Sequence, residues 1–364
     1  MDLKYYIMRR LLLIIPTFIG LVLIVFMLMR SIPNTELVAP YLNNKSSIPL
    51  SVQIKNAEVL LGIRFADGAF VPVPLEFFYY LKDIFIGQWG DMSITGYYTG
   101  SVIHAISLYA PNTIQLALIS TVVAILIAIP MGTYIGSRPD SFADQAGRIF
   151  SLTGYAMPAF WLALLLQIAF GKNVIAGNPL GVLPISLPYT ISGSLPSWIS
   201  ATTGQSYPTH IIIIDSIIHG DFSLTLNAIE HLILPVATLT YGILAGLLRF
   251  IRAGMVDSSN QEYVKTARMK GVSERVVIRR HIRKNGLLPT VTVVGLLFAS
   301  LLTGVVLIED VFNYKGLGLL AYESVYYHSL YGTLGTTIMF GIILMSANLV
   351  VDIVYAFLDP RIRY

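Results

Sequence analysis

The sequence contains no cysteine and little charge. Without cysteine, disulfide frameworks, thiolate zinc sites, iron–sulfur clusters and cysteine nucleophiles are excluded. Only 12% of the 364 residues are charged and 55% are hydrophobic, whereas a soluble domain carries about 25% charged residues. The mean hydropathy is +0.70. A water-soluble protein this poor in charge could not cover its surface, so the composition predicts a polytopic membrane protein.

Six apolar stretches are long enough, or nearly so, to cross a bilayer as helices, which takes about 20 residues each. They are residues 11–29, 111–136, 149–171, 232–248, 287–308 and 331–351. We therefore expect an all-α fold with six transmembrane helices. The first is expected to be retained, because no small-x-small site follows it as in a cleaved signal peptide. Residues 211–214 are too short to span and predict a strand or an interfacial segment.

Positive charge is distributed unevenly and predicts the orientation. Residues 173–248 contain no lysine or arginine, whereas residues 249–284 are rich in both. Because basic residues stay on the cytoplasmic side, we expect the connection between spans four and five, and both termini, in the cytoplasm. Residues 31–110 are then external. They carry four basic residues, but long loops translocate largely regardless of charge, and their mixed composition predicts a small folded region.

The connection between spans four and five predicts a helix, a tight turn and a second, basic helix. Ser259 and Glu262 fit a capping box that opens the first helix. Gly271 fits the left-handed cap that ends it, Ser273 is placed to cap the second helix, and residues 285–286 are expected to stop it.

Three interpretations of this connection are open from its residues. It could be a solvated basic loop on anionic lipid headgroups, a DNA-binding helix-turn-helix, or a docking element seated in a groove of a cytoplasmic partner. DNA binding is disfavoured because both ends are tethered to spans within a few residues, and a recognition helix must enter a major groove freely.

Residues 262–271 read EYVKTARMKG, followed by SER at 273–275 and LLP at 287–289. This run closely resembles the cytoplasmic signature of binding-protein-dependent ABC importer permeases, and more narrowly the first permease subunit of the dipeptide/oligopeptide branch. Only Ala267 agrees with the alanines of the general signature, and the Leu-Pro pair comes late; both departures are similar to the peptide branch's own version. Further similar stretches are residues 9–17, 111–117, 309–312, 316–318 and 358–364.

The resemblance covers most of the chain, but it is poor over residues 33–87 and 173–228. It implies a type I ABC importer permease core at residues 111–364, a first helix at 1–30 and an external region at 31–110. Residues 255–286 would be the cytoplasmic coupling segment. Its ATPase-coupling residues are expected to be Glu262, Thr266, Ala267, Arg268, Lys270, Gly271, Ser273, Glu274 and Arg275.

The resemblance also implies partners in the cell membrane. These would be a second homologous permease subunit, two ATP-binding subunits and an extracellular substrate-binding protein, in a lipid bilayer and without nucleic acid. The chain has no G-x-x-x-x-G-K-[ST] loop that could cradle ATP phosphates. We therefore expect ATP and Mg to be bound by the partner ATPases, and this chain to be no enzyme and to hold no cofactor or metal.

The implied function is half of a translocation pathway for small peptides, working by alternating access. Oligosaccharides, nickel or another small solute are alternatives within the same role. An ATP-independent channel or secondary transporter is an alternative of another class, but it would need inverted repeats or charged relays within the spans. Neither is clear in the sequence, and no clustered catalytic set of a membrane enzyme is apparent.

Polar residues within the spans are the candidates for the translocation path, although such side chains more often serve helix packing. They are Asn112, Gln115, Gln167, Thr238, Tyr241 and Asn348. Two glycine pairs with G-x-x-x-G spacing, 132/136 and 242/246, suit close helix contact. Asp352 is an acid within the last span, for which we favour an ion pair with an interfacial arginine.

Overall fold

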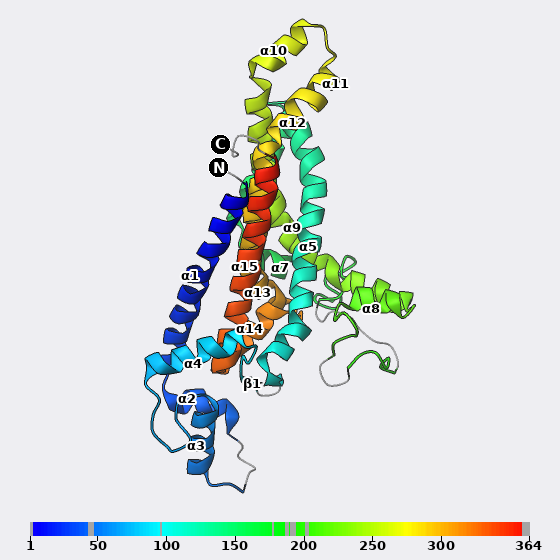
Figure 1. The fold of residues 1–364 in the computed structure, drawn as a ribbon. Helices are drawn as coiled ribbons and strands as arrows, with labels where there is room; N and C mark the ends of the chain where they lie inside the picture. Colours follow the sequence, from blue (N-terminus) through cyan, green and yellow to red (C-terminus); the bar gives the residue numbers. More distant parts are fainter. Residues whose placement is uncertain are drawn as a thin grey trace.

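The computed structural model describes residues 3–42, 47–94, 97–176, 178–185, 189, 194–200 and 204–358. Long helices form a bundle with shorter elements at its two ends (Figure 1). Among the described residues, four helices are long and apolar enough to cross a membrane. They are α1 (Leu3–Arg30), α5 (Val102–Gly136), α9 (Phe222–Ser259) and α15 (Leu330–Leu358). The chain is thus a mostly helical, multi-pass membrane protein.

The predicted third span is not one straight helix. It consists of α6 (Phe142–Ala156) and α7 (Ala159–Phe170), which are bent by 107° at the break between them. Pro158 causes the break, because a proline ring disfavours the helical conformation of the residue before it. Met157 accordingly has an extended backbone, with ψ 123°. Counted as one span, this pair would be a fifth crossing.

Other helix boundaries also differ from the sequence-based expectation. Helix α5 begins nine residues before Pro111 and carries that proline inside it. Helix α9 has 38 residues, about 57 Å at 1.5 Å per residue, so it is longer than the hydrocarbon core of about 30 Å. Helix α13 (Leu288–Val311) is followed by the short α14 (Leu317–Tyr326). Residues 212–218 form helix α8 (Ile212–Ile218), so the predicted strand is wrong.

Residues 31–101 are folded against the ends of two long helices. They contain α2 (Asn34–Val38), η1 (Ala39–Tyr41), α3 (Leu50–Leu60), α4 (Val73–Phe85) and the antiparallel strands β1 (Asp91–Ile94) and β2 (Tyr98–Ser101). Apolar side chains of this region share one core with Phe26 of α1 and with Leu334 of α15. These elements lie at one end of the bundle, and the start of α1 and the end of α15 point toward the other (Figure 1).

The main core lies between α5 and α9, and glycine sets their approach. A Cβ added at Gly132 would lie 2.7 Å from Ile251, and one at Gly136 would lie 2.6 Å from Met255. The predicted close contact of this pair is therefore confirmed. The second pair, Gly242 and Gly246, does not make the same close contact, because a Cβ at Gly242 would meet nothing within 4 Å. The terminal stretch 359–364 and the side chain of Asp352 lie outside the described residues.

Candidate functional site

Residues 260–287, the tip segment, project from the bundle as a helical pair (Figure 1). The segment comprises α10 (Glu262–Met269), α11 (Glu274–Val276), the π-helix η2 (Val277–Ile282) and α12 (Arg283–Gly286). It leaves the end of α9 and returns into α13. Both ends are thus fixed to long helices, so a displacement of the tip would be passed to them.

The turn between α10 and α11 has the predicted glycine cap. Gly271 has φ +75°, and its N–H donates to the carbonyl oxygen of Arg268 at 3.0 Å. The N–H of Val272 donates to the carbonyl oxygen of Ala267 at 3.2 Å. This pair of bonds is a Schellman motif, which satisfies carbonyl groups left open at a helix end.

Of the other predicted helix signals of the tip segment, the cap at Ser259 is wrong and the positions of Ser273 and Gly286 are confirmed. Ser259 is the last residue of α9 and not the cap of α10, because α9 continues through it; the residue at the cap position is Gln261, without a side-chain capping bond. Ser273 occupies its predicted cap position, but its side chain makes no capping bond. Helix α12 ends at Gly286, as predicted, with Leu287 as its C-cap residue. A Cβ at Gly286 would lie 2.8 Å from the carbonyl oxygen of Gly254, so this glycine allows α12 to pack on α9.

Helix α10 has one buried and one exposed face. Val264 and Ala267 are buried in the main core with Val277 and Ile282, so they anchor α10 to the core of the bundle. The exposed predicted coupling residues are Glu262, Thr266, Arg268, Lys270, Gly271, Ser273, Glu274 and Arg275. Between them lies Met269, 80% exposed, which sequence reasoning did not single out. The sequence feature that could have indicated Met269 is its position, an apolar residue two positions before the capping Gly271.

An ion pair closes the tip segment across the turn. The Arg268 guanidinium donates to both carboxylate oxygens of Glu274, at 3.1 Å and 2.7 Å. The same hydrogen bonds from Arg268 lower the pKa of Glu274 below its usual value. Both side chains are exposed, where a pair of this kind contributes only about 0–1 kcal/mol. The pair therefore orients the turn more than it stabilises it.

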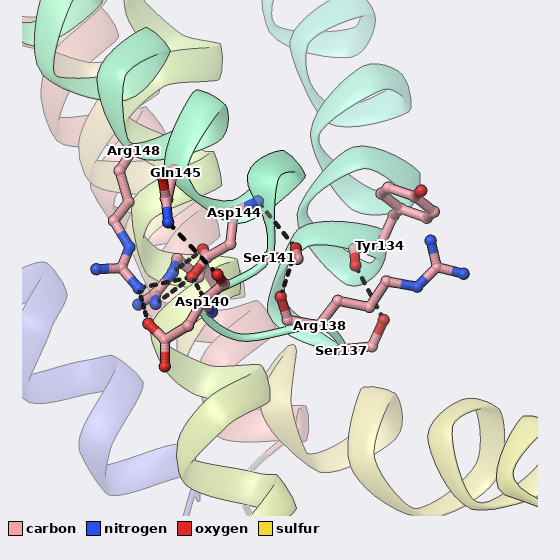
Figure 2. Close-up of polar contacts among 9 residues, drawn as sticks. Tyr134, Ser137, Arg138, Asp140, Ser141, Asp144, Gln145 and Arg148 are labelled. Atoms are coloured by element: carbon pink, nitrogen blue, oxygen red, sulfur yellow. Dashed lines mark hydrogen bonds and ion pairs between the residues drawn. The ribbon is translucent and has the colours of Figure 1, made fainter.

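An ion cluster around the buried carboxylate of Asp144 joins the start of α6 to α9. Asp144, 0% exposed, accepts from Arg252 of α9 through Nε and, at 2.8 Å, Nη2. It also accepts from Arg148 at 2.6 Å and from the backbone N–H of Asp140 at 2.9 Å. Figure 2 shows Asp140 and Arg148 gathered around this carboxylate. Arg252 lies seven residues before the end of α9, so the cluster braces the helix that leads into the tip segment.

Sequence reasoning missed this cluster, although a signal was present. Asp140, Asp144 and Arg148 are spaced by four residues, which places i and i+4 side chains on one helix face. The partner Arg252, 108 positions away from Asp144, could not have been assigned without the fold.

A second buried polar cluster surrounds the turn between α13 and α14. Glu309, 0% exposed, accepts from Thr113 Oγ1 at 2.5 Å and from the N–H of Leu319 at 2.9 Å. Thr113 Oγ1 in turn accepts from the N–H of Leu317 at 2.7 Å. The carboxylate thus satisfies open N–H groups in the first turn of α14. Three elements, α5, α13 and α14, meet at this one group.

Two glycines make room for the Glu309 carboxylate. A Cβ at Gly316 would lie 2.2 Å from Glu309 Oε1, and one at Gly318 would lie 2.9 Å from Glu309 Oε2. Residues 309–312 and 316–318 are stretches on which the family resemblance was drawn. Glu309, Gly316 and Gly318 of these stretches are therefore explained by one contact, in which the carboxylate packs against the glycines at the start of α14.

Three of the predicted path residues converge on the same turn. Asn112 donates to the carbonyl oxygen of Lys315 at 2.8 Å, and Gln115 Oε1 lies 3.5 Å from the Tyr314 hydroxyl. Gln167 of α7 donates to the carbonyl oxygen of Val311 at 3.1 Å. These side chains hold the α13–α14 turn in the present conformation.

The other three predicted path residues are apart from this turn. Thr238 donates to a carbonyl oxygen within its own helix at 2.8 Å. The Tyr241 hydroxyl donates to the carbonyl oxygen of Phe150 at 3.3 Å and its ring packs edge-on against the Phe150 ring. Asn348 is half-buried in α15. Within the part of the chain that is described, no group of three or more His, Asp or Glu residues could hold a metal ion.

The bundle, the doubly tethered tip and the uncommonly apolar helices are those of a membrane transport component. The sequence profile of binding-protein-dependent transport system inner membrane components matches residues 124–364. The chain belongs to this family. The match begins inside α5 and includes both polar clusters' residues on α6, α9 and α13, together with the whole tip segment.

Several relatives are similar over nearly their full length. The dipeptide transport system permease protein DppB of Alkalihalophilus pseudofirmus is 31% identical, with 99% of each chain covered. The oligopeptide transport system permease protein AppB of Bacillus subtilis is 30% identical, also with 99% of each covered. The probable D,D-dipeptide transport system permease protein DdpB of Escherichia coli is 31% identical over 84% of each. The chain is thus similar to permeases of the dipeptide and oligopeptide branch.

Proposed function

We propose that this chain is a permease subunit of an ATP-driven importer of small peptides, and that the tip segment couples it to ATPase subunits. The observation that carries the coupling role is the tip segment itself, a rigid helical pair tethered at both ends to long helices. A helix that seats in a partner's groove can pass a rigid-body movement to the elements to which it is fixed. The peptide substrate is supported by the three relatives, all of which are peptide permeases by name.

The exposed face of α10 supplies a suitable docking surface. Met269 offers a flexible apolar side chain, and such side chains adapt well to grooves. Charged residues of both signs surround it, including Glu262 and Lys270. The buried face, with Val264 and Ala267, fixes the helix to the end of α9. Docking would then displace α9, and the Asp144 cluster would carry the α5–α6 connection with it.

The proposed topology has six spans and both termini in the cytoplasm. Four long apolar helices and the bent pair α6–α7 supply up to five crossings. Helix α13, with 24 residues, is about 36 Å long and would be the sixth. An even number of spans is supported by the two ends of the chain. The start of α1 and the end of α15 lie toward the same end of the bundle as the tip segment (Figure 1).

The assembly proposed here contains a second homologous permease, two ATP-binding subunits and an external substrate-binding protein. ATP binding would close the ATPases, move the docked tips and turn the pathway outward, and hydrolysis would reset it. Residues 31–101 and α8 lie away from the tip segment (Figure 1), where they would meet the substrate-binding protein.

A pull-down of the tagged chain in mild detergent, followed by mass spectrometry, tests this proposal. We expect a second permease and two ATPases to co-purify, and Met269→Asp to release the ATPases while the second permease stays bound. A matched control is Met8→Asp, which changes another exposed methionine outside the tip segment. Recovery of a homo-oligomer that moves solute without ATP would contradict the proposal in favour of a channel or secondary transporter.

A further inference from the structure

The basic face of η2 and α12 has no role in the docking surface of α10. Arg279, Arg280, Arg283 and Lys284, with Leu287, line a hollow of about 540 Å³. A second hollow of about 700 Å³ adjoins it, shares its three arginines and extends to Arg275 and Val276.

These cations have no internal counter-charge. Across the described part of the chain, no aspartate or glutamate forms an ion pair with Arg279, Arg280, Arg283 or Lys284. Four like charges around one hollow repel one another, and an anion placed between them would relieve that repulsion. Guanidinium groups match the geometry of phosphate oxygens, which they bind through paired N–H donors.

The hollow lies beside the apolar start of α13, where the hydrocarbon core of a membrane would begin. Helix α12 runs through Leu287 into the apolar α13, and Leu288 is 45% exposed. At 1.5 Å per residue, Lys284 in α12 lies about 6 Å before Leu288, and Arg279 in the π-helix η2 lies farther out. The headgroup layer is about 5–8 Å thick on each side of the hydrocarbon core. Lysine and arginine side chains extend along such a boundary with their charged ends in the polar layer.

We propose that the hollow lined by Arg279, Arg280, Arg283, Lys284 and Leu287 binds the phosphate headgroup of an anionic phospholipid, with Leu287 against the start of its acyl chains. Basic residues directly beside a transmembrane helix attract anionic lipids. An acidic ATPase surface is the less favoured occupant, because Lys284 and Leu287 of this hollow border the apolar start of α13, whereas α10 lies at the far end of the tip segment (Figure 1). The proposal requires only that the chain is embedded in a membrane, so it can fail or hold separately from the docking role of α10.

Native mass spectrometry of the purified full chain in detergent tests the site, with phosphatidylglycerol or phosphatidylcholine added in increasing amounts. We expect phosphatidylglycerol to be retained at a lower concentration. Arg279→Gln/Arg283→Gln should require at least about tenfold more of it, because each lost charge weakens anionic-lipid attraction severalfold. The matched control Lys265→Gln/Lys270→Gln removes two exposed charges from the tip and should leave retention unchanged. Arg279→Lys/Arg283→Lys keeps the charge and should retain the lipid, which keeps the test valid if the neutral variant misfolds.

Four outcomes would overturn the proposal. Equal retention of the two lipids, or unchanged retention by the folded Arg279→Gln/Arg283→Gln variant, would exclude an anionic-lipid site. Displacement of phosphatidylglycerol by millimolar inorganic phosphate would point to a free-phosphate site. Loss of ATPase capture with lipid retention unchanged would assign the hollow to the ATPase. Capture of the ATPases by the same variants is measured in parallel, so failure of the lipid site is distinguished from failure of the coupling role.

Discussion

The turn at Gly271 gives a sharp test of coupling. A side chain added there would meet nothing within 4 Å, so a substitution is strained only through the backbone, at φ +75°. For an L-residue the left-handed conformation costs about 1–2 kcal/mol, and β-branched residues are at the upper end of that range. Gly271→Val should therefore reduce the population of the intact turn about 5- to 30-fold. Asparagine tolerates this conformation, so Gly271→Asn is the matched control.

We expect Gly271→Val to uncouple hydrolysis from uptake. Opening the turn would separate Arg268 from Glu274 and tilt the exposed face of α10, while the bundle would be unaffected because the turn lies outside it. The assay is uptake of labelled dipeptide per phosphate released, by the complex reconstituted in vesicles. The ratio should fall at least about fivefold for Gly271→Val and stay near the wild-type value for Gly271→Asn, with equal insertion of both. A wild-type ratio for a correctly inserted Gly271→Val variant would refute the coupling role of the turn.

Three further perturbations follow from the buried groups. Asp144→Asn removes the buried counter-charge shared by Arg252, 26% exposed, and Arg148, 44% exposed, and should lower the free energy of unfolding by about 1–3 kcal/mol, whereas Asp140→Asn, at an 86% exposed side chain, should change it by less than about 1 kcal/mol; equal effects in thermal unfolding would refute the cluster's role. Gly316→Ala should displace the Glu309 carboxylate and lower the melting temperature, while Gly242→Ala, where a Cβ meets nothing within 4 Å, should not; indistinguishable melting curves would contradict the packing argument. Burial raises the pKa of Glu76 to about 7, partly opposed by Arg30. The folded chain then binds this proton more tightly than the unfolded chain, so stability should fall as pH rises from about 5 to about 7, and Glu76→Gln should flatten that part of the pH profile; a slope that persists in this variant would assign it to another group.

The contacts at the α13–α14 turn show what three of the predicted path residues do in this conformation. Asn112, Gln115 and Gln167 bond to the α13–α14 turn, so in this conformation they brace helices. Rearrangement of that turn would free their polar groups. Their place in the translocation path stays a prediction, and substitutions that alter uptake without altering stability would support it.

The sequence by itself determined the membrane class, the positions of the apolar helices, the family and the glycine-capped turn of the tip segment. These properties follow from local composition and short-range spacing, since hydropathy over about 20 residues and a single left-handed glycine act within one helix or turn. The tertiary structure decided where the helices bend and end. Pro158 divides one apolar run into two helices, and α9 extends through Ser259, where a local capping signal had suggested a boundary.

Only the fold could assign the long-range polar contacts. Asp144 meets Arg252 across 108 positions, and Glu309 meets Thr113 across 196. Gly254 and Gly286 are also distant in sequence, yet their backbones touch. Such pairs depend on how helices cross, and helix crossing is fixed by the packing of whole faces and not by any local pattern. The sequence therefore contained the residues of the tip segment, whereas the packing of α5, α9 and α13 decided how that segment is held.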